Sequence, residues 1–177
     1  MMSSPERSDT ALTLVLVGPM AAGKTSVGRR AARLLEVPFI DTDKRISAEH
    51  GPIPQIFAEH GEPYFRALER EAVAAAVAEG GVVSLGGGAV TDAGTRALLA
   101  RHPVVFLTVS PDSVARRITG AGRPLLAGEG DPVERWRTIF HERRGWYEEV
   151  ADLTVDTSHR PMRMLAEEIA AWRKEQA

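Results

Sequence analysis

The sequence predicts an α/β fold in which helices cover both faces of a parallel β-sheet. Two observations indicate this class. Short apolar runs of strand length alternate with longer stretches whose apolar residues recur at helical spacing, which is typical of βαβ units. The chain has 177 residues, of which 44% are hydrophobic and 26% charged, and this is enough for one domain with its own core.

Five short apolar runs are the predicted strands. Gly18 closes the first run and Asp41 closes the second, as residues that interrupt a buried strand do. The runs cover Leu12–Val17, Val37–Ile40, Val82–Leu85, Pro103–Val109 and Leu153–Val155.

Helices are predicted between these strands, and several of their ends carry clear signals. Gly51 and Gly61 are C-terminal stops, Thr91 or Asp92 is an N-cap, and Ser110 is a cap followed by proline. The predicted helices cover Lys24–Glu36, Asp43–Glu49, Ile53–Glu59, Glu62–Ala78, Asp92–Ala100, Ser110–Ile118, Asp131–Glu148 and Pro161–Arg173.

Two segments show no periodicity. Residues 1–10 are polar, and we expect them to be a disordered tail. Residues 120–130 contain four glycines and a proline, which predicts a mobile loop. No linker or internal repeat interrupts the rest, so residues 11–177 are expected to form a single domain.

Composition excludes several classes of function. The absence of cysteine rules out disulfides and thiolate chemistry and suits a cytoplasmic protein. A net charge of -2 argues against broad binding to nucleic acid or to a membrane surface. The apolar runs are too short to span a bilayer, and Met1–Thr10 has no signal-peptide core. We therefore expect a cytoplasmic protein, and we also expect a monomer.

The segment Gly18–Thr25 matches the phosphate-binding pattern G-x-x-x-x-G-K-[ST]. It follows a predicted strand and opens a predicted helix, so backbone N–H groups and the helix N-terminus can surround phosphate oxygens. Lys24 is expected to reach the β- and γ-phosphates of ATP, and the Thr25 hydroxyl to hold Mg²⁺. The alternative, a glycine-rich turn without a ligand, is disfavoured by this strand–loop–helix context.

Two carboxylates, Asp41 and Asp43, come directly after the second strand. Ligands of open parallel sheets bind outside the carboxyl ends of the strands, so both side chains can face such a crevice. One can hold a magnesium-bound water, and the other can orient the attacking hydroxyl or take its proton. The alternative is that they are helix N-caps.

Three consecutive glycines, Gly86, Gly87 and Gly88, follow the third strand. Such a run lowers stability through backbone entropy, so something must require a bare backbone. Close approach of a ligand ring is one explanation, and a tight turn is the other.

Three arginines are candidates for binding an anionic substrate. Arg66 has Glu69 three residues further on, which can hold its guanidinium. Arg143 lies near the end of a long helix, and Arg123 lies in the glycine-rich loop. Two forked guanidiniums suit a carboxylate, and one more suits a phosphoryl group. The alternative is that they belong to solvated helix faces.

Other residue types give weaker signals. The five histidines show no metal-ligand spacing. Trp136, Trp146 and Trp172 lie at helical positions, which favours packing over stacking on a base.

These motifs together resemble the shikimate kinase family over about residues 11–173. Besides the P-loop, the resemblance is carried in this order by Asp41-Thr42-Asp43, Ile56-Phe57, Gly61-Glu62, Phe65-Arg66, Leu85-Gly86-Gly87-Gly88-Ala89-Val90, Arg123-Pro124-Leu125-Leu126, Glu142-Arg143 and Tyr147-Glu148-Glu149-Val150-Ala151-Asp152. It implies a three-layer P-loop kinase fold with strand order 2-3-1-4-5, a substrate-binding segment near 42–70 and a mobile lid near 119–130. It implies ATP- and Mg²⁺-dependent phosphorylation of shikimate to shikimate 3-phosphate.

The resemblance also assigns roles. Catalysis falls to Asp43 as base, with Lys24 and Arg123. Magnesium binding falls to Thr25 and Asp41. The nucleotide would contact Gly18, Ala21, Ala22, Gly23, Lys24, Thr25, Ser26, Arg117, Arg123, Arg160 and Pro161. Shikimate would contact Asp43, Phe57, Phe65, Arg66, Glu69, Gly86, Gly87, Gly88 and Arg143.

Three positions depart from the family pattern. Ala21 replaces a usual glycine and fits if its φ is negative. Arg144-Gly145-Trp146 replaces a usual proline and leucine, and Arg143 is preferred to Arg144 because it lies four residues before Tyr147. Ile53 lies between two prolines, which can shift the start of its helix.

Two other functions remain open on the sequence. One is a kinase of the same fold for another small acid such as gluconate, against which the paired arginines and the triple glycine favour a rigid ring acid. The other is a nucleotide-binding regulator that has lost phosphotransfer, against which Lys24, Thr25, Asp43 and Arg123 argue.

Overall fold

Five short runs rich in valine, leucine and isoleucine form a parallel sheet, as the sequence predicts. The computed structural model describes residues 12–118 and 128–177. The strands are β1 (Thr13–Val17), β2 (Phe39–Asp41), β3 (Gly81–Ser84), β4 (Val104–Thr108) and β5 (Leu153–Asp156). Their order is β2-β3-β1-β4-β5, and every neighbouring pair is parallel, so the predicted order is confirmed.

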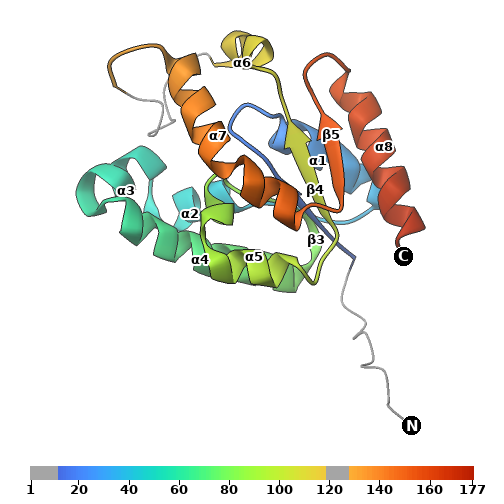
Figure 1. Ribbon diagram of the computed structural model, residues 1–177. Coiled ribbons are helices and arrows are strands. Elements are labelled where there is room, and N and C mark those ends of the chain that lie inside the picture. The colour runs from blue at the N-terminus through green and yellow to red at the C-terminus, as the bar shows by residue number, and fades with distance from the viewer. Residues whose placement is uncertain (1–11, 119–127) are drawn as a thin grey trace.

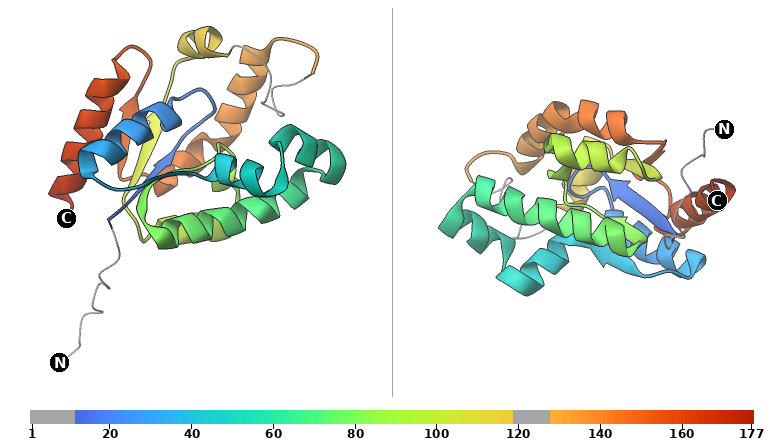
Figure 2. Two further views of the ribbon diagram at one scale, coloured as in Figure 1. Left: turned by 180° about the vertical axis from the view of Figure 1, so that it is seen from behind. Right: turned by 90° about the horizontal axis from the view of Figure 1, so that it is seen from below.

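Helices cover both faces of this sheet (Figure 1). In chain order the helices are α1 (Lys24–Leu35), α2 (Thr42–His50), α3 (Ile53–His60), α4 (Glu62–Glu79), α5 (Ala93–Leu99), α6 (Pro111–Arg117), α7 (Pro132–Val150) and α8 (Met162–Glu175). A short 3₁₀ turn, η1 (Ala89–Thr91), was not predicted. Seen from behind, α1 and α8 lie side by side on one face (Figure 2). Helices α4, α5 and α7 cover the other.

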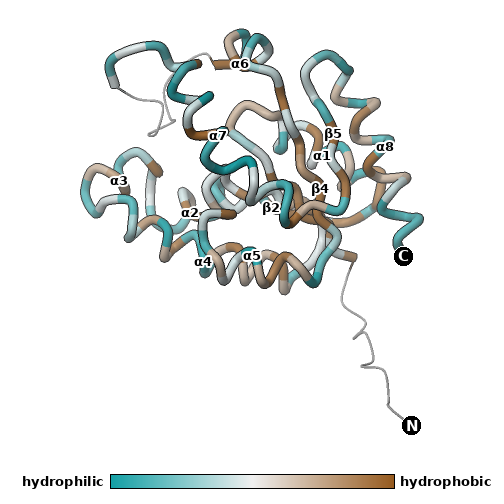
Figure 3. The backbone as a smooth tube through the Cα atoms, in the orientation of Figure 1, coloured by the Kyte–Doolittle hydropathy of each residue, from teal (hydrophilic) through white to brown (hydrophobic). Residues whose placement is uncertain are grey.

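Two hydrophobic cores result from the alternation of side chains along each strand. Leu14 and Leu16 of β1 pack with α1 and α8, whereas Val15 and Val17 pack with α4, α5 and α7. Because β1 is buried on both faces, it is a continuous apolar run, which is usual for a central parallel strand. Apolar residues accordingly gather on the strands and the inward sides of the helices (Figure 3).

A third, smaller core holds the segment that was expected to bind substrate. Ile46, Ile56 and Phe65 join α2, α3 and the start of α4. Helix α3 begins at Ile53 as predicted, so the flanking prolines do not shift its start. This unit lies at one edge of the molecule, at the left of Figure 1.

Element boundaries agree with the sequence within one or two residues, with β2 as an instructive case. The predicted strand began at Val37, but the structure starts it at Phe39. Glu36 takes a left-handed conformation with φ 55°, and the Val37 N–H donates to the carbonyl of Ala32. Residues 36–37 therefore finish α1 before the strand can begin.

Two predicted features lie outside the described residues. These are the disordered tail over 1–10 and most of the mobile lid over 119–130, including Arg123. Among the described helices, none combines the length and the apolar character needed to cross a membrane.

Candidate active site

A pocket of about 320 Å³ opens at the carboxyl end of the sheet. It is built by the loop after β1, the start of α2 after β2, the loop after β3 and one residue of α6. The structure brings together in its wall these predicted site residues: Ala21, Gly23, Lys24, Thr25, Ser26, Asp41, Asp43, Gly86, Gly87 and Arg117. Segments far apart in sequence thus meet at one rim, as expected for parallel strands.

The loop between β1 and α1 has glycine at two positions where a side chain would be strained. Gly18 has φ 148°, and a Cβ there would overlap the carbonyl oxygen of Leu107. Gly23 has φ 90°, and a Cβ would lie 2.8 Å from the Cε of Met162. Helix α1 then starts at Lys24, so its unpaired N–H groups face the loop interior. The loop has the form of an anion cradle.

Lys24 folds back over this cradle. Its Nζ donates to the carbonyls of Gly18 at 2.7 Å and Pro19 at 2.9 Å. The ammonium therefore lies across the mouth of the loop, where phosphate oxygens would meet it.

Ala21 contradicts one expectation. The family resemblance required a negative φ at this alanine, but its φ is 66°. A left-handed alanine costs about 1 kcal/mol. Tertiary contacts hold it there, because the carbonyls of residues 20–22 all accept side-chain hydrogen bonds from elsewhere in the chain.

Three donors make these contacts. Trp136 Nε1 donates to Met20 O at 2.8 Å. Arg117 Nη1 donates to Ala21 O at 2.9 Å, and Thr157 Oγ1 donates to Ala22 O at 2.7 Å. With these carbonyls held outward, the loop conformation is fixed.

Thr25 and Asp41 form the candidate magnesium site. Thr25 Oγ1 donates to Asp41 Oδ2 at 3.0 Å, and the other oxygen of Asp41 caps α2 by accepting the Lys44 N–H at 3.2 Å. Both alternatives for Asp41, cap and site residue, are therefore compatible. These are hard oxygen donors, and Mg²⁺ in nucleotide enzymes needs only one or two protein oxygens beside phosphates and water, so the residues fit the ion. Within residues 12–118 and 128–177, no group of three or more carboxylate or histidine ligands provides another site.

Asp43 lies in the first turn of α2 and does not cap it. It is half-buried and lines the pocket. A Cβ on Gly86 would lie 2.5 Å from Asp43 Oδ1 and 2.9 Å from Glu69 Oε2. The two carboxylates therefore converge on the same point of the glycine loop.

Close side chains, rather than turn geometry, explain two of the three consecutive glycines. None of the three glycines has a positive φ, so a tight turn does not require them. The carboxylates of Asp43 and Glu69 leave no room for a Cβ on Gly86, and a Cβ on Gly88 would overlap the guanidinium of Arg66. Gly87 has room, with Met20 N at 3.5 Å from a Cβ position. The bare backbone lets charged groups approach closely.

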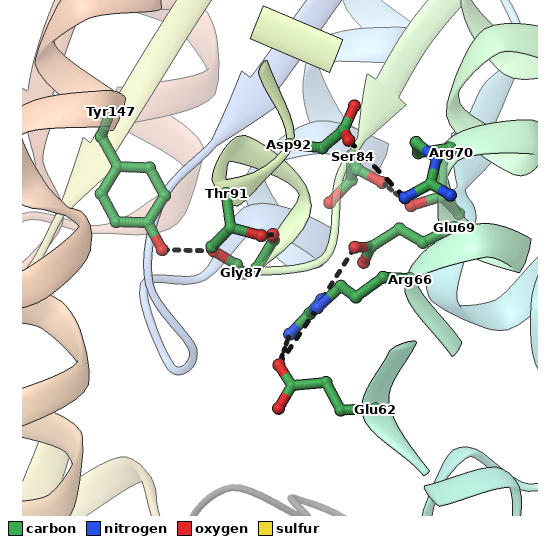
Figure 4. A network of polar contacts seen from close by, with 11 residues as sticks. Glu62, Arg66, Glu69, Arg70, Ser84, Gly87, Thr91, Asp92 and Tyr147 are labelled. Atoms are coloured by element: carbon green, nitrogen blue, oxygen red, sulfur yellow. Dashed lines mark hydrogen bonds and ion pairs between the residues drawn. The ribbon is translucent and has the colours of Figure 1, made fainter. Parts of the chain in front are cut away.

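Arg66 is held by two glutamates of its own helix (Figure 4). Its Nη1 donates to Glu69 Oε1 at 2.7 Å, and its Nη2 donates to Glu62 Oε1 at 3.1 Å. Glu69 Oε2 is buried and has no hydrogen-bond partner among the described residues. Burial raises the pKa of Glu69 to about 7, although Arg66 acts in the opposite direction. The sequence anticipated the Arg66–Glu69 pair.

Aromatic rings flank this arginine. Phe65 is buried, its ring centroid lies 4.9 Å from that of Phe57, and the Arg66 guanidinium lies 5.3 Å from the Phe65 centroid. Neither phenylalanine lines the described pocket, whose wall comes from the loops after β1 and β3, the starts of α1 and α2, and Arg117 of α6.

Arg143 is buried, whereas its neighbour Arg144 is exposed. Arg143 is 7% exposed and lies close enough to Glu69 and Tyr147 that its charge opposes the rise in pKa that burial causes in both. Burial is the larger effect on Tyr147 and raises the pKa of its hydroxyl to about 12. Arg144 is exposed and pairs with Glu148 at 2.8 Å. The structure therefore favours Arg143 as the inward-facing arginine.

Of the residues expected near adenine, Arg117 lines the pocket, whereas Arg160 and Pro161 do not. Arg117 lies in the pocket wall, where it donates to Ala21 and also to the Thr157 carbonyl at 2.5 Å. Arg160 and Pro161 are exposed and do not line the pocket, and Arg160 pairs with Glu168 at 2.5 Å. Met162, next to Pro161, lies against Gly23. Arg123 lies outside the described residues.

Sequence reasoning missed three residues that shape the site. Thr157 and Trp136 hold the phosphate loop from distant parts of the chain, and no local pattern marks them. Tyr147 appears in a quoted motif without a role, yet its hydroxyl donates to the Gly87 carbonyl at 2.5 Å (Figure 4).

The model of the family described as shikimate kinase matches residues 20–174. The chain belongs to the shikimate kinase family. A relative named shikimate kinase from Salinispora arenicola is 51% identical over 160 residues, covering 89% of this chain and 95% of the relative.

Comparison with solved structures also points to the shikimate kinase family. A shikimate kinase from Acinetobacter baumannii in complex with shikimate has a TM-score of 0.86 and 36% identity, with 94% of this chain and 95% of that chain covered. A gluconokinase from Sinorhizobium meliloti has a TM-score of 0.55 and 21% identity, with 95% of this chain and 94% of that chain covered. The second likeness shows only a shared fold.

Proposed function

We propose that this protein transfers the γ-phosphate of ATP to a hydroxyl of shikimate, giving shikimate 3-phosphate and ADP with the help of Mg²⁺. The observation that carries this proposal is one pocket in which a phosphate cradle and Asp43 share a wall. Family membership and the shikimate complex of the similar Acinetobacter enzyme support shikimate as the acceptor.

The cradle binds the nucleotide phosphates. Backbone N–H groups of residues 18–25 and the N-terminus of α1 surround the phosphate oxygens, and Lys24 Nζ exchanges its two carbonyl partners for them. Thr25 and Asp41 would hold Mg²⁺, and the ion would offset negative charge on the transferring phosphoryl group.

Asp43 acts on the acceptor. Its carboxylate accepts the hydrogen bond of the attacking hydroxyl, orients that oxygen toward the γ-phosphorus and takes its proton as the new P–O bond forms. The P–O bond to ADP breaks in the same in-line step. Little covalent chemistry is required of the protein, so positioning supplies most of the rate.

Arg66 and Arg143 bind the carboxylate of shikimate. Glu69 and Glu62 fix the Arg66 guanidinium, and Glu69 Oε2 remains available to accept a further hydrogen bond. Phe57 and Phe65 flank the ring, and Gly86–Gly88 let it approach the backbone.

Four further residues are assigned from the family resemblance. Arg123 closes over the γ-phosphate with the segment 119–130 and helps exclude water that would hydrolyse ATP. Arg117, Arg160 and Pro161 flank the adenine. We also propose that the protein is cytoplasmic, which its lack of cysteine supports, and has no nucleic-acid partner, which its net charge of -2 supports. We propose further that it is a monomer with a single domain over 11–177.

A panel of acceptors tests the proposal. ADP release is measured by a coupled assay with ATP and Mg²⁺ in the presence of shikimate, gluconate or no acceptor. The expected result is turnover with shikimate at least 100 times that with either control, since polar sites reject poorly matched acceptors by such factors. Equal rates with gluconate, or ADP release independent of any acceptor, would reject shikimate as the substrate.

A further inference from the structure

Helix α7 contacts both loops of the active site through two buried aromatic side chains. Trp136, near its start, donates its indole N–H to the Met20 carbonyl of the phosphate loop at 2.8 Å. Tyr147, near its end, donates its hydroxyl to the Gly87 carbonyl of the glycine loop at 2.5 Å. Both side chains are 1% exposed. One helix therefore holds the nucleotide side and the acceptor side of the pocket.

The spacing of the two donors suits this arrangement. Trp136 and Tyr147 are three helical turns apart, about 16 Å along the axis, so they lie on the same face of α7. Phe140 and Arg143 occupy the turns between them on that face. Arg143, the proposed carboxylate-binding arginine, is thus carried by the same face as the two donors.

The helix face is stiffened by aromatic packing. The ring of Phe140 stacks on Trp136 at 5.1 Å between centroids and lies 6.3 Å from Tyr147. Phe106 of β4 stacks on Tyr147 at 5.2 Å. Close-packed rings with few alternative rotamers allow little movement of one donor relative to the other.

The two loops that α7 holds also face each other directly. A Cβ on Gly87 would lie 3.5 Å from Met20 N and 3.6 Å from Gly18 O. Displacement of either loop therefore changes the distance between bound nucleotide and bound acceptor. An in-line transfer is sensitive to that distance.

We propose that Trp136 and Tyr147 are positioning residues that set the separation of the phosphate loop from the glycine loop through the rigid helix α7. This inference rests on the proposed function. A purely structural role is the competing explanation, since buried tryptophan and tyrosine usually find a hydrogen-bond partner. The two explanations differ in what happens to the rate of the chemical step in folded protein.

Trp136→Phe and Tyr147→Phe test the proposal. Each removes one N–H or O–H donor and keeps an aromatic ring in the same place. Trp172→Phe and Tyr64→Phe are matched controls, because neither residue lines the pocket. Trp172 belongs to α8 and packs against the core on that face of the sheet, and Tyr64 is exposed. Single-turnover phosphoryl transfer to shikimate is measured by rapid quench, with separate titrations of ATP and shikimate and a thermal melt of each protein.

Each test variant is expected to slow single-turnover transfer about threefold to tenfold, as befits the loss of one hydrogen bond to a loop carbonyl. Dissociation constants for ATP and shikimate should change less than twofold, because each ligand keeps its own contacts. The double variant should be slowed less than the product of the single effects, since the helix is already released at one end. The controls should match wild type.

Transfer rates within twofold of wild type in both variants, with only the melting temperature lowered, would overturn the proposal. Tyr147→Phe is nearly isosteric and keeps the test valid if Trp136→Phe does not fold. Failure of the proposed function looks different: wild type and both controls would then lack shikimate-dependent transfer.

Discussion

Replacement of Gly86 by alanine tests whether the carboxylates that converge on the glycine loop position the acceptor. The new Cβ would lie 2.5 Å from Asp43 Oδ1 and 2.9 Å from Glu69 Oε2. Non-bonded carbon and oxygen do not approach so closely, so both carboxylates or the loop must move by roughly 0.5–1 Å. Gly86 has no positive φ, so backbone strain does not complicate the change.

The expected loss follows from that displacement. A misplacement of about 1 Å in a site that works by positioning lowers the rate about 100-fold. This corresponds to about 2.7 kcal/mol of transition-state stabilisation. The forced contact should also reduce the free energy of unfolding by about 1–3 kcal/mol, as overpacking does.

The assay is coupled ADP release at varied shikimate, combined with urea unfolding of the same protein. Gly145→Ala is the matched control, because nothing lies within 4 Å of its Cβ position on α7. It should keep full activity and gain about 0.5–1 kcal/mol of stability, since alanine suits a helix interior better than glycine. A wild-type value of kcat/KM for shikimate in Gly86→Ala would refute the reasoning that the glycine loop positions the Asp43 carboxylate.

Three further changes have defined outcomes. In steady-state kinetics, Arg66→Ala should raise KM for shikimate at least tenfold and KM for ATP less than twofold. The reason is that the change removes a bidentate partner of the acceptor carboxylate. A larger effect on KM for ATP than on KM for shikimate would show that Arg66 does not belong to the acceptor site. Thr25→Val should raise the Mg²⁺ concentration that gives half-maximal rate about tenfold, whereas Thr25→Ser should keep the wild-type value. The same Mg²⁺ dependence in wild type, Thr25→Val and Thr25→Ser would exclude the Thr25–Asp41 site. Because the pKa of Glu69 is raised to about 7, folded protein keeps this proton longer than unfolded protein, and stability falls as pH rises from about 4.5 to 7. Urea unfolding of Glu69→Gln should lack that component of the slope, and parallel pH profiles for both proteins would contradict the raised pKa.

Local signals predicted most of the fold. Each strand is a short apolar run bounded by glycine, proline or aspartate, and caps such as Ser110 and Asp92 do what their position in the sequence indicates. The strand order came from the family resemblance rather than from the residues themselves, because hydrophobic periodicity does not say which strands pair.

Tertiary contacts decided the features that the sequence did not predict. The positive φ of Ala21 depends on donors from α6, α7 and the segment after β5, and Trp136 lies 116 residues from the carbonyl it holds. Gly86 lies against Asp43 and Glu69, and Gly88 lies against Arg66, contacts that no local sequence pattern indicates. The run of glycines identified the loop as unusual, but it did not indicate which side chains lie against that loop.

The most direct measurement of the central claim compares wild type with Asp43→Asn. The claim is that Asp43 and the phosphate cradle act on one acceptor hydroxyl in one pocket. Shikimate-dependent ADP release should fall at least 100-fold in Asp43→Asn, as for loss of a general base, while ATP affinity stays within about threefold of wild type. Undiminished shikimate-dependent release in Asp43→Asn would contradict the account.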